Sequence, residues 1–222
     1  MNATPHLAVI GAGLAGLSCA AALQQAGVKV TVCEKSRGAA GRMSTRRGED
    51  WQCDHGAQYF TARHPDFRAE VERWVRAGVA GIWAPRLQVL GGSIERVPDA
   101  ALERFVGVPA MTAPARHLAQ ALSLVAQTTI TEVQRAADRW QLLTAASLLP
   151  AFGQLGGPTP QAWTAHRWRY ADTEPPLDAG CTWEPDLGLG LCGDWLNGGK
   201  VEGAWLSGRA LAQQVLQSFG SR

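Results

Sequence analysis

The chain has 222 residues, with 46% hydrophobic residues, 18% charged residues and a formal net charge of +2. This composition excludes a disordered or fibrous chain and fits a globular protein of one or two domains. Such a small net charge gives no reason to expect a nucleic-acid partner. Apolar runs stay well short of the ~18 residues that a membrane-spanning helix needs, so we expect no membrane partner either.

The cysteines and the first residues bear on the compartment. The five cysteines are odd in number and show no CxxC spacing, so we expect neither a zinc site nor a disulfide framework. The N-terminal residues lack the basic region of a secretory signal, and we therefore predict a cytoplasmic protein. The sequence leaves the oligomeric state open.

The first chemical motif is Gly11-Ala12-Gly13-Leu14-Ala15-Gly16, between an apolar run at residues 7–10 and a helix-periodic stretch up to residue 25. Strand, glycine turn and helix in this order predict the first unit of a dinucleotide-binding Rossmann domain. Gly11 permits a tight turn, Gly13 lets a pyrophosphate approach the backbone, and Gly16 lets the helix pack closely on the strand. The N–H groups at the helix start would face the phosphates.

A second strand is predicted at residues 28–32, where valines alternate with polar residues, and Glu34 follows it before Lys35. Glu34 lies at about the twenty-residue offset where a carboxylate accepts the ribose hydroxyls of an adenosine. The same carboxylate would repel a 2′-phosphate, which favours a cofactor without one. The alternative is a glycine-rich βαβ turn that binds no ligand.

Spacing alone does not separate NAD from FAD, but Ala40-Gly41-Arg42 follows Glu34 after five residues. This stretch resembles the extended fingerprint of FAD-binding flavoproteins, with Ala40 where a glycine is usual. The resemblance implies Arg42 near the pyrophosphate and Met43 near the flavin, with an NAD-dependent enzyme as the alternative. The basic run that includes Arg46 is either a solvated loop or a contact to an anionic ligand.

Periodicity predicts the remaining elements. Helices are expected at residues 65–77, 115–126, 145–155 and 201–217, and short strands at 81–83, 87–90 and 93–97. A hairpin is expected from strands 128–134 and 140–143. A further strand at 166–170 would place His166 and Trp168 on one face, where packing is a common role for a histidine. A buried strand at 187–192 completes the set.

The end of the chain repeats the logic of the opening turn. Gly193-Asp194-Trp195 follows the expected buried strand, and Gly198-Gly199 leads into the final helix. The N–H groups of Glu202, Gly203 and Ala204 could therefore donate to an anionic ligand.

Five stretches taken together, GAGLAG, AGRMSTRR, DHGAQYFTAR, HRWRYA and CGDWLNGGKVEGAWLSG, resemble the bacterial renalase-like flavoproteins, which belong to the wider group of flavin-dependent amine oxidases. The resemblance implies an α/β fold: a Rossmann-type FAD-binding domain of the GR2-like flavoprotein fold, with a reduced α+β substrate-domain portion. The FAD-binding domain would comprise residues 1–62, 128–144 and 165–222. The substrate or cap portion would comprise residues 63–127 and 145–164.

The resemblance also implies an FAD site and a reaction. Such proteins oxidise a small molecule, a dihydronicotinamide dinucleotide or an amine, by hydride transfer to flavin N5, with molecular oxygen as electron acceptor. No catalytic nucleophile or base is identified, and no metal is expected. Tyr59, His166 and Trp168 would face the substrate. The residues expected to bind FAD are Gly11, Ala12, Gly13, Leu14, Ala15, Gly16, Glu34, Lys35, Gly41, Arg42, Met43, Gly56, Ala57, Gln58, Tyr59, Val133, Gly193, Asp194, Gly203 and Ala204.

The chain departs from this family in one interval. Relatives of this kind carry most of a substrate domain and one strand of the sheet between the counterparts of Leu143 and His166, where this chain has only about 20 residues. We therefore expect a sheet that lacks a strand, with an exposed edge and a substrate side open to water. The alternative function is an FAD-binding remnant without efficient catalysis.

Overall fold

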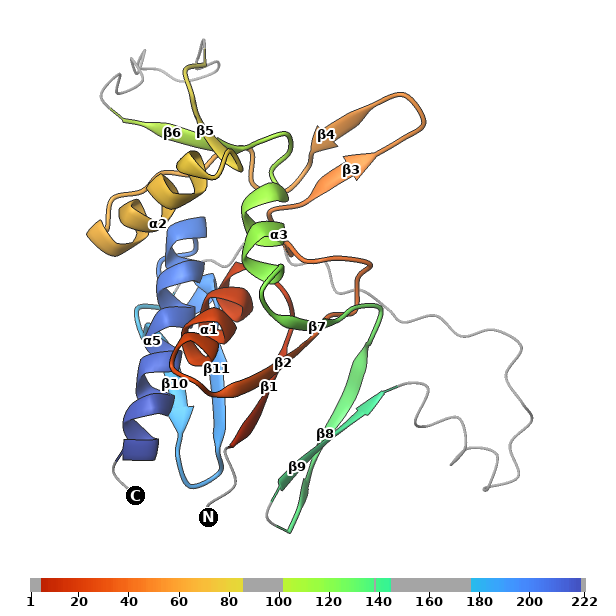
Figure 1. Cartoon of the computed structure of the whole chain (residues 1–222), viewed down its shortest axis with the longest axis vertical. Coiled ribbons are helices and arrows are strands. Elements are labelled where there is room, and N and C mark those ends of the chain that lie inside the picture. Colours follow the sequence, from red (N-terminus) through yellow and green to blue (C-terminus); the bar gives the residue numbers. More distant parts are fainter. Residues whose placement is uncertain (1–4, 86–101, 138, 145–176, 221–222) are drawn as a thin grey trace, which may run out of the picture.

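The computed structural model describes residues 5–85, 102–137, 139–144 and 177–220, and Figure 1 shows their arrangement. The elements in these ranges are β1 (His6–Ile10), α1 (Leu14–Gln25), β2 (Lys29–Cys33), β3 (Thr45–Arg47), β4 (Gln52–Asp54), α2 (Pro65–Arg76), β5 (Ala80–Trp83), β6 (Arg104–Gly107), α3 (Ala113–Ala119), β7 (Ser123–Val125), β8 (Ile130–Ala136), β9 (Arg139–Thr144), β10 (Cys181–Glu184), β11 (Leu189–Cys192), the 3₁₀ helix η1 (Asp194–Leu196) and α5 (Val201–Gly220).

A three-stranded parallel sheet in the order β1-β2-β7 forms the centre of the Rossmann-like fold. β1 pairs with β2 along its whole length, and α1 is the crossover helix between them. The predicted α/β Rossmann-type fold is confirmed. Its first strand, helix and second strand lie where the glycine motif and the valine alternation predicted them.

The prediction of one helix over residues 115–126 is wrong. Helix α3 ends at Ala119, and Ser123–Val125 forms β7, which pairs in parallel with Thr31–Cys33 of β2. Pairing with a strand about ninety residues away overrides the local helical periodicity. Because β7 belongs to the central sheet, the sheet extends into the range 63–127 that the sequence assigned to the cap portion.

Helix α5 packs against α1, and the two cross closely (Figure 1). A Cβ atom on Gly208 would lie 2.1 Å from the carbonyl oxygen of Ala15, so only glycine permits this approach. Ser18 reinforces the crossing, since its hydroxyl donates to the Trp205 carbonyl oxygen at 2.7 Å. The last helix is thereby fixed beside the helix that follows the glycine turn.

A second part of the core is aromatic and lies where α2 meets the β5–β6 hairpin. The ring of Phe60 lies 6.0 Å from that of Trp74 and 5.9 Å from that of Phe105. Phe67 connects this cluster to α5, because its ring lies 5.5 Å from that of Trp205. Burial of aromatic side chains of this size contributes strongly to stability.

Three antiparallel hairpins, β3–β4, β8–β9 and β10–β11, complete the described strands. The β8–β9 hairpin was predicted and is confirmed. The strand expected at residues 187–192 is confirmed as β11, but its expected burial is wrong, because Leu189 and Leu191 are 37% and 52% exposed. β11 alternates between exposed and half-buried residues and pairs with β10, a strand that the periodicity did not reveal.

Among the described strands, β1 pairs with β2 alone and is an edge strand of the central sheet, and Ile10 at its end is 53% exposed. The expectation that the sheet lacks a strand stays a prediction. The expected strands 87–90, 93–97 and 166–170, with His166 and Trp168, and the expected helix 145–155 lie outside the described residues.

Candidate dinucleotide-binding cleft

The three glycines of the opening turn have three different roles in the structure. Gly11 has a φ of +104°, a conformation that glycine adopts without strain. A Cβ on Gly16 would lie 2.2 Å from the Gly11 carbonyl oxygen, so Gly16 is required for packing. At Gly13 the nearest atom to such a Cβ would be 4.0 Å away. Protein packing therefore does not require a glycine at position 13, whereas a ligand close to the backbone would.

The start of α1 presents free donors beside Gly13. The first bond of this helix runs from the Leu17 N–H to the Gly13 carbonyl oxygen at 2.9 Å. The N–H groups of Leu14, Ala15 and Gly16 precede that bond, and all three residues line the cleft. They can donate to a phosphate, as the sequence predicted.

Glu34 lies at the end of β2 and is 6% exposed. One carboxylate oxygen accepts the Ala12 N–H at 2.7 Å, and the other accepts the Ser36 N–H at 2.8 Å. Each oxygen keeps a second lone pair for a ribose hydroxyl. Glu34 therefore also fixes the glycine turn to the second strand, a role that its spacing did not reveal.

The Ala40-Gly41-Arg42 stretch lies directly against the glycine turn. The Ala40 N–H donates to the Ala12 carbonyl oxygen at 3.0 Å. Ala40 has a φ of +147°, a backbone conformation that favours glycine, which explains why a glycine is usual there. Gly41, with a φ of +57°, lies so close to Gly13 that a Cβ would be 3.0 Å from the Gly13 Cα atom.

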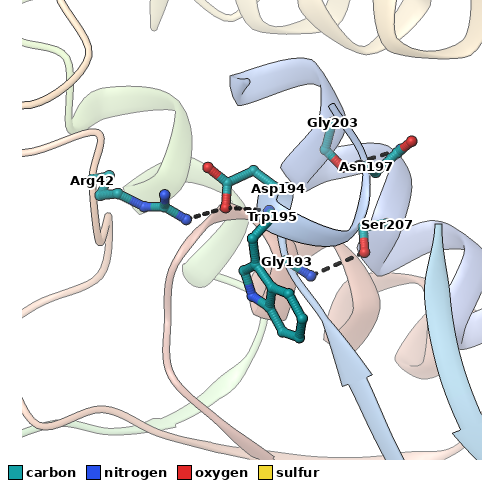
Figure 2. A network of polar contacts seen from close by, with 7 residues as sticks. All are labelled: Arg42, Gly193, Asp194, Trp195, Asn197, Gly203 and Ser207. Atoms are coloured by element: carbon teal, nitrogen blue, oxygen red, sulfur yellow. Dashed lines mark hydrogen bonds and ion pairs between the residues drawn. The ribbon is translucent and has the colours of Figure 1, made fainter. Parts of the chain in front are cut away.

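Arg42 and Asp194 form an ion pair across the cleft (Figure 2). The Asp194 side chain is 10% exposed and the Arg42 side chain is 49% exposed. The Asp194 oxygen that meets Arg42 also accepts the Trp195 N–H at 2.9 Å. Two residues that were predicted separately to bind FAD, 152 positions apart, are thus in direct contact.

The loop before α5 is held by buried hydrogen bonds. The Gly193 N–H donates to the Ser207 hydroxyl at 2.9 Å (Figure 2). That hydroxyl in turn donates to the Gly180 carbonyl oxygen. Ser207 is fully buried. Gly193 and Asp194 are therefore positioned by the helix that follows them and by the segment before β10.

One detail of the α5 prediction is corrected. The Ala204 N–H donates to the Lys200 carbonyl oxygen at 2.9 Å, so it is not free for a ligand. Ala204 does line the cleft, but Gly203 does not, since it packs against the backbone of Asn197. The Glu202 carboxylate accepts the N–H groups of Arg63 and His64 at 2.8 and 2.5 Å, which ties the start of α5 to the start of α2.

Most of these residues border one cleft of about 2000 Å³. Drug-sized ligands occupy pockets of about 300–1,000 Å³, so this cleft has room for a dinucleotide and more. Of the predicted cofactor residues, Ala12, Gln58 and Gly203 do not line it. Those that do are Gly11, Gly13, Leu14, Ala15, Gly16, Glu34, Lys35, Gly41, Arg42, Met43, Gly56, Ala57, Tyr59, Val133, Gly193, Asp194 and Ala204.

Some lining residues were not predicted, among them Trp140 and Leu142 of β9 and Trp183 of β10. The alternation of Trp140 and Leu142 along a strand could have indicated a shared face. No signal pointed to Trp183. Among the described residues, no group of three or more histidine, cysteine or acidic side chains could hold a metal ion.

In the described part of the chain, the cleft has more unpaired cationic side chains than unpaired acidic ones. Its three carboxylates are engaged: Glu34 with two backbone N–H groups, Asp194 with Arg42, and Glu202 with two further N–H groups. Within the described ranges, four cationic side chains that line the cleft form no ion pair: Lys35, Arg46, Arg63 and Lys200. The cleft therefore favours anionic ligands.

Comparison with known proteins finds likeness mainly in the N-terminal part of the chain. Residues 9–74 match the family model of the NAD(P)-binding Rossmann-like domain. An L-amino-acid oxidase from Siganus canaliculatus is 40% identical over 70 residues, which span 31% of this chain and 13% of that protein. The matched segment is thus a small part of that relative.

Solved structures give a weaker likeness. Wild-type putrescine oxidase bound to putrescine aligns with a TM-score of 0.46 and 14% identity, over 64% of this chain and 56% of that one. A putative FAD-containing monooxygenase from Photorhabdus luminescens subsp. laumondii TTO1 aligns with a TM-score of 0.41 and 16% identity, over 64% and 35%.

These findings define a Rossmann-like dinucleotide-binding domain over the N-terminal part of the chain. The match to the Rossmann-like domain and the short likeness to an L-amino-acid oxidase agree with the predicted dinucleotide cofactor, FAD, and with the wider flavin-dependent amine oxidase group. The renalase-like type and the role of each site residue stay predictions. Among the described helices, none is long and apolar enough to cross a membrane.

Proposed function

We propose that this chain is an FAD-dependent oxidoreductase of the renalase type, which oxidises a small molecule and passes the electrons to molecular oxygen. One observation carries the proposal: a single cleft brings together the glycine turn, Glu34, the Arg42–Asp194 pair and the start of α5. These features come from opposite ends of the sequence. Such convergence on one concave site is what a bound dinucleotide requires.

The chain's residues supply binding and orientation. When bound, FAD accepts a hydride from the substrate and passes two electrons to oxygen. The N–H groups at the start of α1 would hold the pyrophosphate, and the Arg42 guanidinium would neutralise part of its charge. Asp194 fixes that guanidinium in place. Glu34 would accept the ribose hydroxyls, since its two backbone bonds hold the carboxylate in a fixed orientation.

The charge of the cleft supports an anionic substrate. FAD carries two phosphates, but Arg46, Arg63 and Lys200 add cationic groups without acidic partners among the described residues. A cationic amine would be repelled by such a wall, whereas a dihydronicotinamide dinucleotide carries a pyrophosphate that fits it. We therefore favour the dihydronicotinamide substrate over an amine.

Tyr59 supports the same class of substrate. Its ring lines the cleft, is 39% exposed and lies 5.8 Å from the ring of Trp83. An exposed aromatic pair of this kind offers a face for a flat ring. Tyr59 is the substrate-facing residue that the sequence predicted within the described range.

Anaerobic mixing tests the function directly. We expect FAD-loaded protein to lose its flavin absorbance with a dihydronicotinamide dinucleotide faster than free FAD does, and to respond weakly to a diamine. Arg46→Gln should raise the substrate concentration needed for half-maximal bleaching. Arg47→Gln is the matched control, since Arg47 is adjacent and exposed but does not line the cleft. Faster bleaching by the diamine would overturn the substrate assignment.

The open edge of β1 favours a second candidate, an FAD-binding module without efficient catalysis. Ile10 at this edge is 53% exposed and lines the cleft, so water reaches the cleft wall there. This candidate predicts protein that retains FAD, with bleaching no faster than that of free FAD by every donor tried. An NAD-dependent enzyme would instead bind NAD tightly, without competition from FAD.

A further inference from the structure

Three side chains meet on one face of the short sheet that β5 and β6 form with the segment around Phe60. Trp83 of β5 and Arg104 of β6 are direct cross-strand partners. The backbones of Phe60 and Phe105 exchange two hydrogen bonds, at 2.9 and 2.8 Å, and both of these side chains are buried in the core. Because side chains alternate along a strand, Tyr59 and Arg104 lie on the opposite face, together with Trp83.

Tyr59 is in contact with both of the other side chains. The guanidinium carbon of Arg104 lies 5.6 Å from the centroid of the Tyr59 ring, within the range of a cation–π interaction. The ring centroids of Tyr59 and Trp83 lie 5.8 Å apart. Of the three residues, only Tyr59 lines the cleft. Arg104 and Trp83 therefore support the Tyr59 ring from outside the cleft, and that ring is the surface that a ligand meets.

The positive charge of Arg104 is not neutralised by a neighbouring acid. Within the ranges that the structure describes, no acidic side chain pairs with Arg104, and the adjacent Glu103 pairs with Arg68 instead. Nη1 of Arg104 donates to the Leu102 carbonyl oxygen at 3.0 Å, whereas its Nε is buried and has no partner among the described residues. A full positive charge therefore lies against the ring of Tyr59.

This charge changes what the Tyr59 ring attracts. The face of a phenol ring carries negative partial charge and by itself attracts a cation. Arg104 already uses that attraction, and its charge repels a second cation that contacts the same ring. A neutral flat ring is not repelled in this way. The Tyr59 ring should therefore bind a neutral ring in preference to a cationic one.

We propose that Arg104 acts through Tyr59 as a positioning residue that distinguishes the neutral, reduced ring of the substrate from the cationic ring of the product. This inference rests on the proposed function, in which the substrate is a dihydronicotinamide dinucleotide. Loss of a hydride turns the neutral dihydronicotinamide ring into a pyridinium cation, and the hydride passes with its two electrons to the flavin. The charge of Arg104 thus favours the ring that is to be oxidised and disfavours the ring that must leave.

Two ligands that cannot donate a hydride test the inference. Nicotinamide is neutral, and 1-methylnicotinamide has the same ring with a positive charge. Ligand-detected NMR titration of the FAD-loaded protein gives both dissociation constants. Arg104→Gln should strengthen binding of 1-methylnicotinamide relative to nicotinamide by about two- to fivefold, the scale of one cation–π contact at an exposed site. Arg104→Met removes the same charge and serves if the glutamine variant does not fold.

Three further variants separate the charge from a structural role. Arg104→Lys keeps the charge and should keep the wild-type ratio of the two constants. Tyr59→Leu should weaken the binding of both ligands. Arg68→Gln is the matched control, because its guanidinium carbon lies 6.0 Å from the ring of Phe105, away from Tyr59, and it should leave both constants unchanged.

The binding experiment and the flavin-bleaching experiment fail independently, because neither nicotinamide ligand is oxidised. A changed ratio without bleaching by a dihydronicotinamide dinucleotide would overturn the proposed function and leave the role of Arg104 in ring selection. Bleaching together with an equal effect of Arg104→Gln on both ligands would overturn the role of Arg104 and leave the function. Wild-type protein that binds 1-methylnicotinamide but not nicotinamide would also overturn it, and so would a protein that binds neither.

Discussion

The two walls of the cleft are held in place by different kinds of contact. On the N-terminal wall, the glycine turn, Glu34 and Ala40-Gly41-Arg42 lie within about thirty residues, and hydrogen bonds among them fix the geometry. On the C-terminal wall, each key residue depends on a distant partner: Asp194 on Arg42, and Glu202 on the backbone of Arg63. The contacts of the N-terminal wall are local, so the sequence could predict them. The contacts of the C-terminal wall join distant segments, so the sequence revealed its motifs but not the residues that they contact.

We expect the largest loss of FAD affinity from a substitution in the N-terminal wall. Gly13→Val should abolish FAD binding while leaving most of the fold, because a side chain there enters open cleft space instead of the core. We expect FAD affinity to fall about a hundredfold or more, which is about 2.7 kcal/mol. Isothermal titration and far-UV circular dichroism measure the two effects.

Gly38→Val is the matched control for this change. A Cβ at Gly38 also meets open space, but Gly38 does not line the cleft. It should leave FAD affinity unchanged. If Gly13→Val retained flavin as well as Gly38→Val does, the glycine motif would have a structural role only.

Substitution of Glu34 tests whether the N-terminal wall contributes both to FAD binding and to the stability of the fold. Glu34→Ala should weaken FAD binding by about 1–3 kcal/mol, the scale of hydrogen bonds to a charged group. It should also lower the free energy of unfolding without ligand, because the Ala12 and Ser36 N–H groups lose their acceptor. Glu49→Ala, an exposed carboxylate in the loop between β3 and β4, is the control. A stability loss with unchanged affinity would place the ribose elsewhere.

Much of the fold and of the N-terminal wall could be predicted, whereas contacts between distant segments could not. α1 was predicted to its last residue because its glycine start and apolar spacing are local signals. β7 was missed because only its hydrogen bonds to β2 distinguish it from a helix end. The contact of Arg42 with Asp194 was not predicted because the two residues lie 152 positions apart. β10 and its residue Trp183 were missed although β10 pairs with the neighbouring strand β11.

The C-terminal wall can be tested through the ion pair of Arg42 with Asp194. Arg42→Ala removes the partner of a carboxylate that is 10% exposed, and should lower the free energy of unfolding by about 1–2 kcal/mol. A fully buried pair would cost more when broken, but half of the Arg42 side chain is solvated, which reduces the effect. Urea unfolding without FAD measures it.

Arg68→Ala provides the comparison for that measurement, because Arg68 pairs on the surface with Glu72 and Glu103. Its loss should cost less than about 1 kcal/mol. A double-mutant cycle of Arg42→Ala with Asp194→Asn should show coupling between the two residues. Additive effects would mean that the pair does not act as one unit.

The smallest expected effect concerns the start of α5 in the C-terminal wall, which we expect to affect both FAD binding and the flavin reduction potential. Ala204 lines the cleft in the first turn of α5, and we propose that this helix start faces the flavin edge that gains negative charge on reduction. A helix terminus contributes ~0.3–2 kcal/mol to a nearby charge. For two electrons, 30 mV corresponds to about 1.4 kcal/mol, so this range equals roughly 6–45 mV. Ala204→Asp adds a full negative charge beside the helix start, and should lower the flavin reduction potential by an amount at or beyond the upper end of that range.

The control for this change lies on the same helix. Gln213→Asp places an equal charge on an exposed position of α5 that does not line the cleft, and should leave the potential unchanged. Affinity for oxidised FAD should fall less in Ala204→Asp than affinity for the reduced form, since only the reduced ring is anionic. Spectroelectrochemical titration of both variants distinguishes the cases. An Ala204→Asp protein that holds FAD at the wild-type potential would show that α5 does not point at the flavin ring, and the C-terminal wall would then bind the cofactor without tuning it.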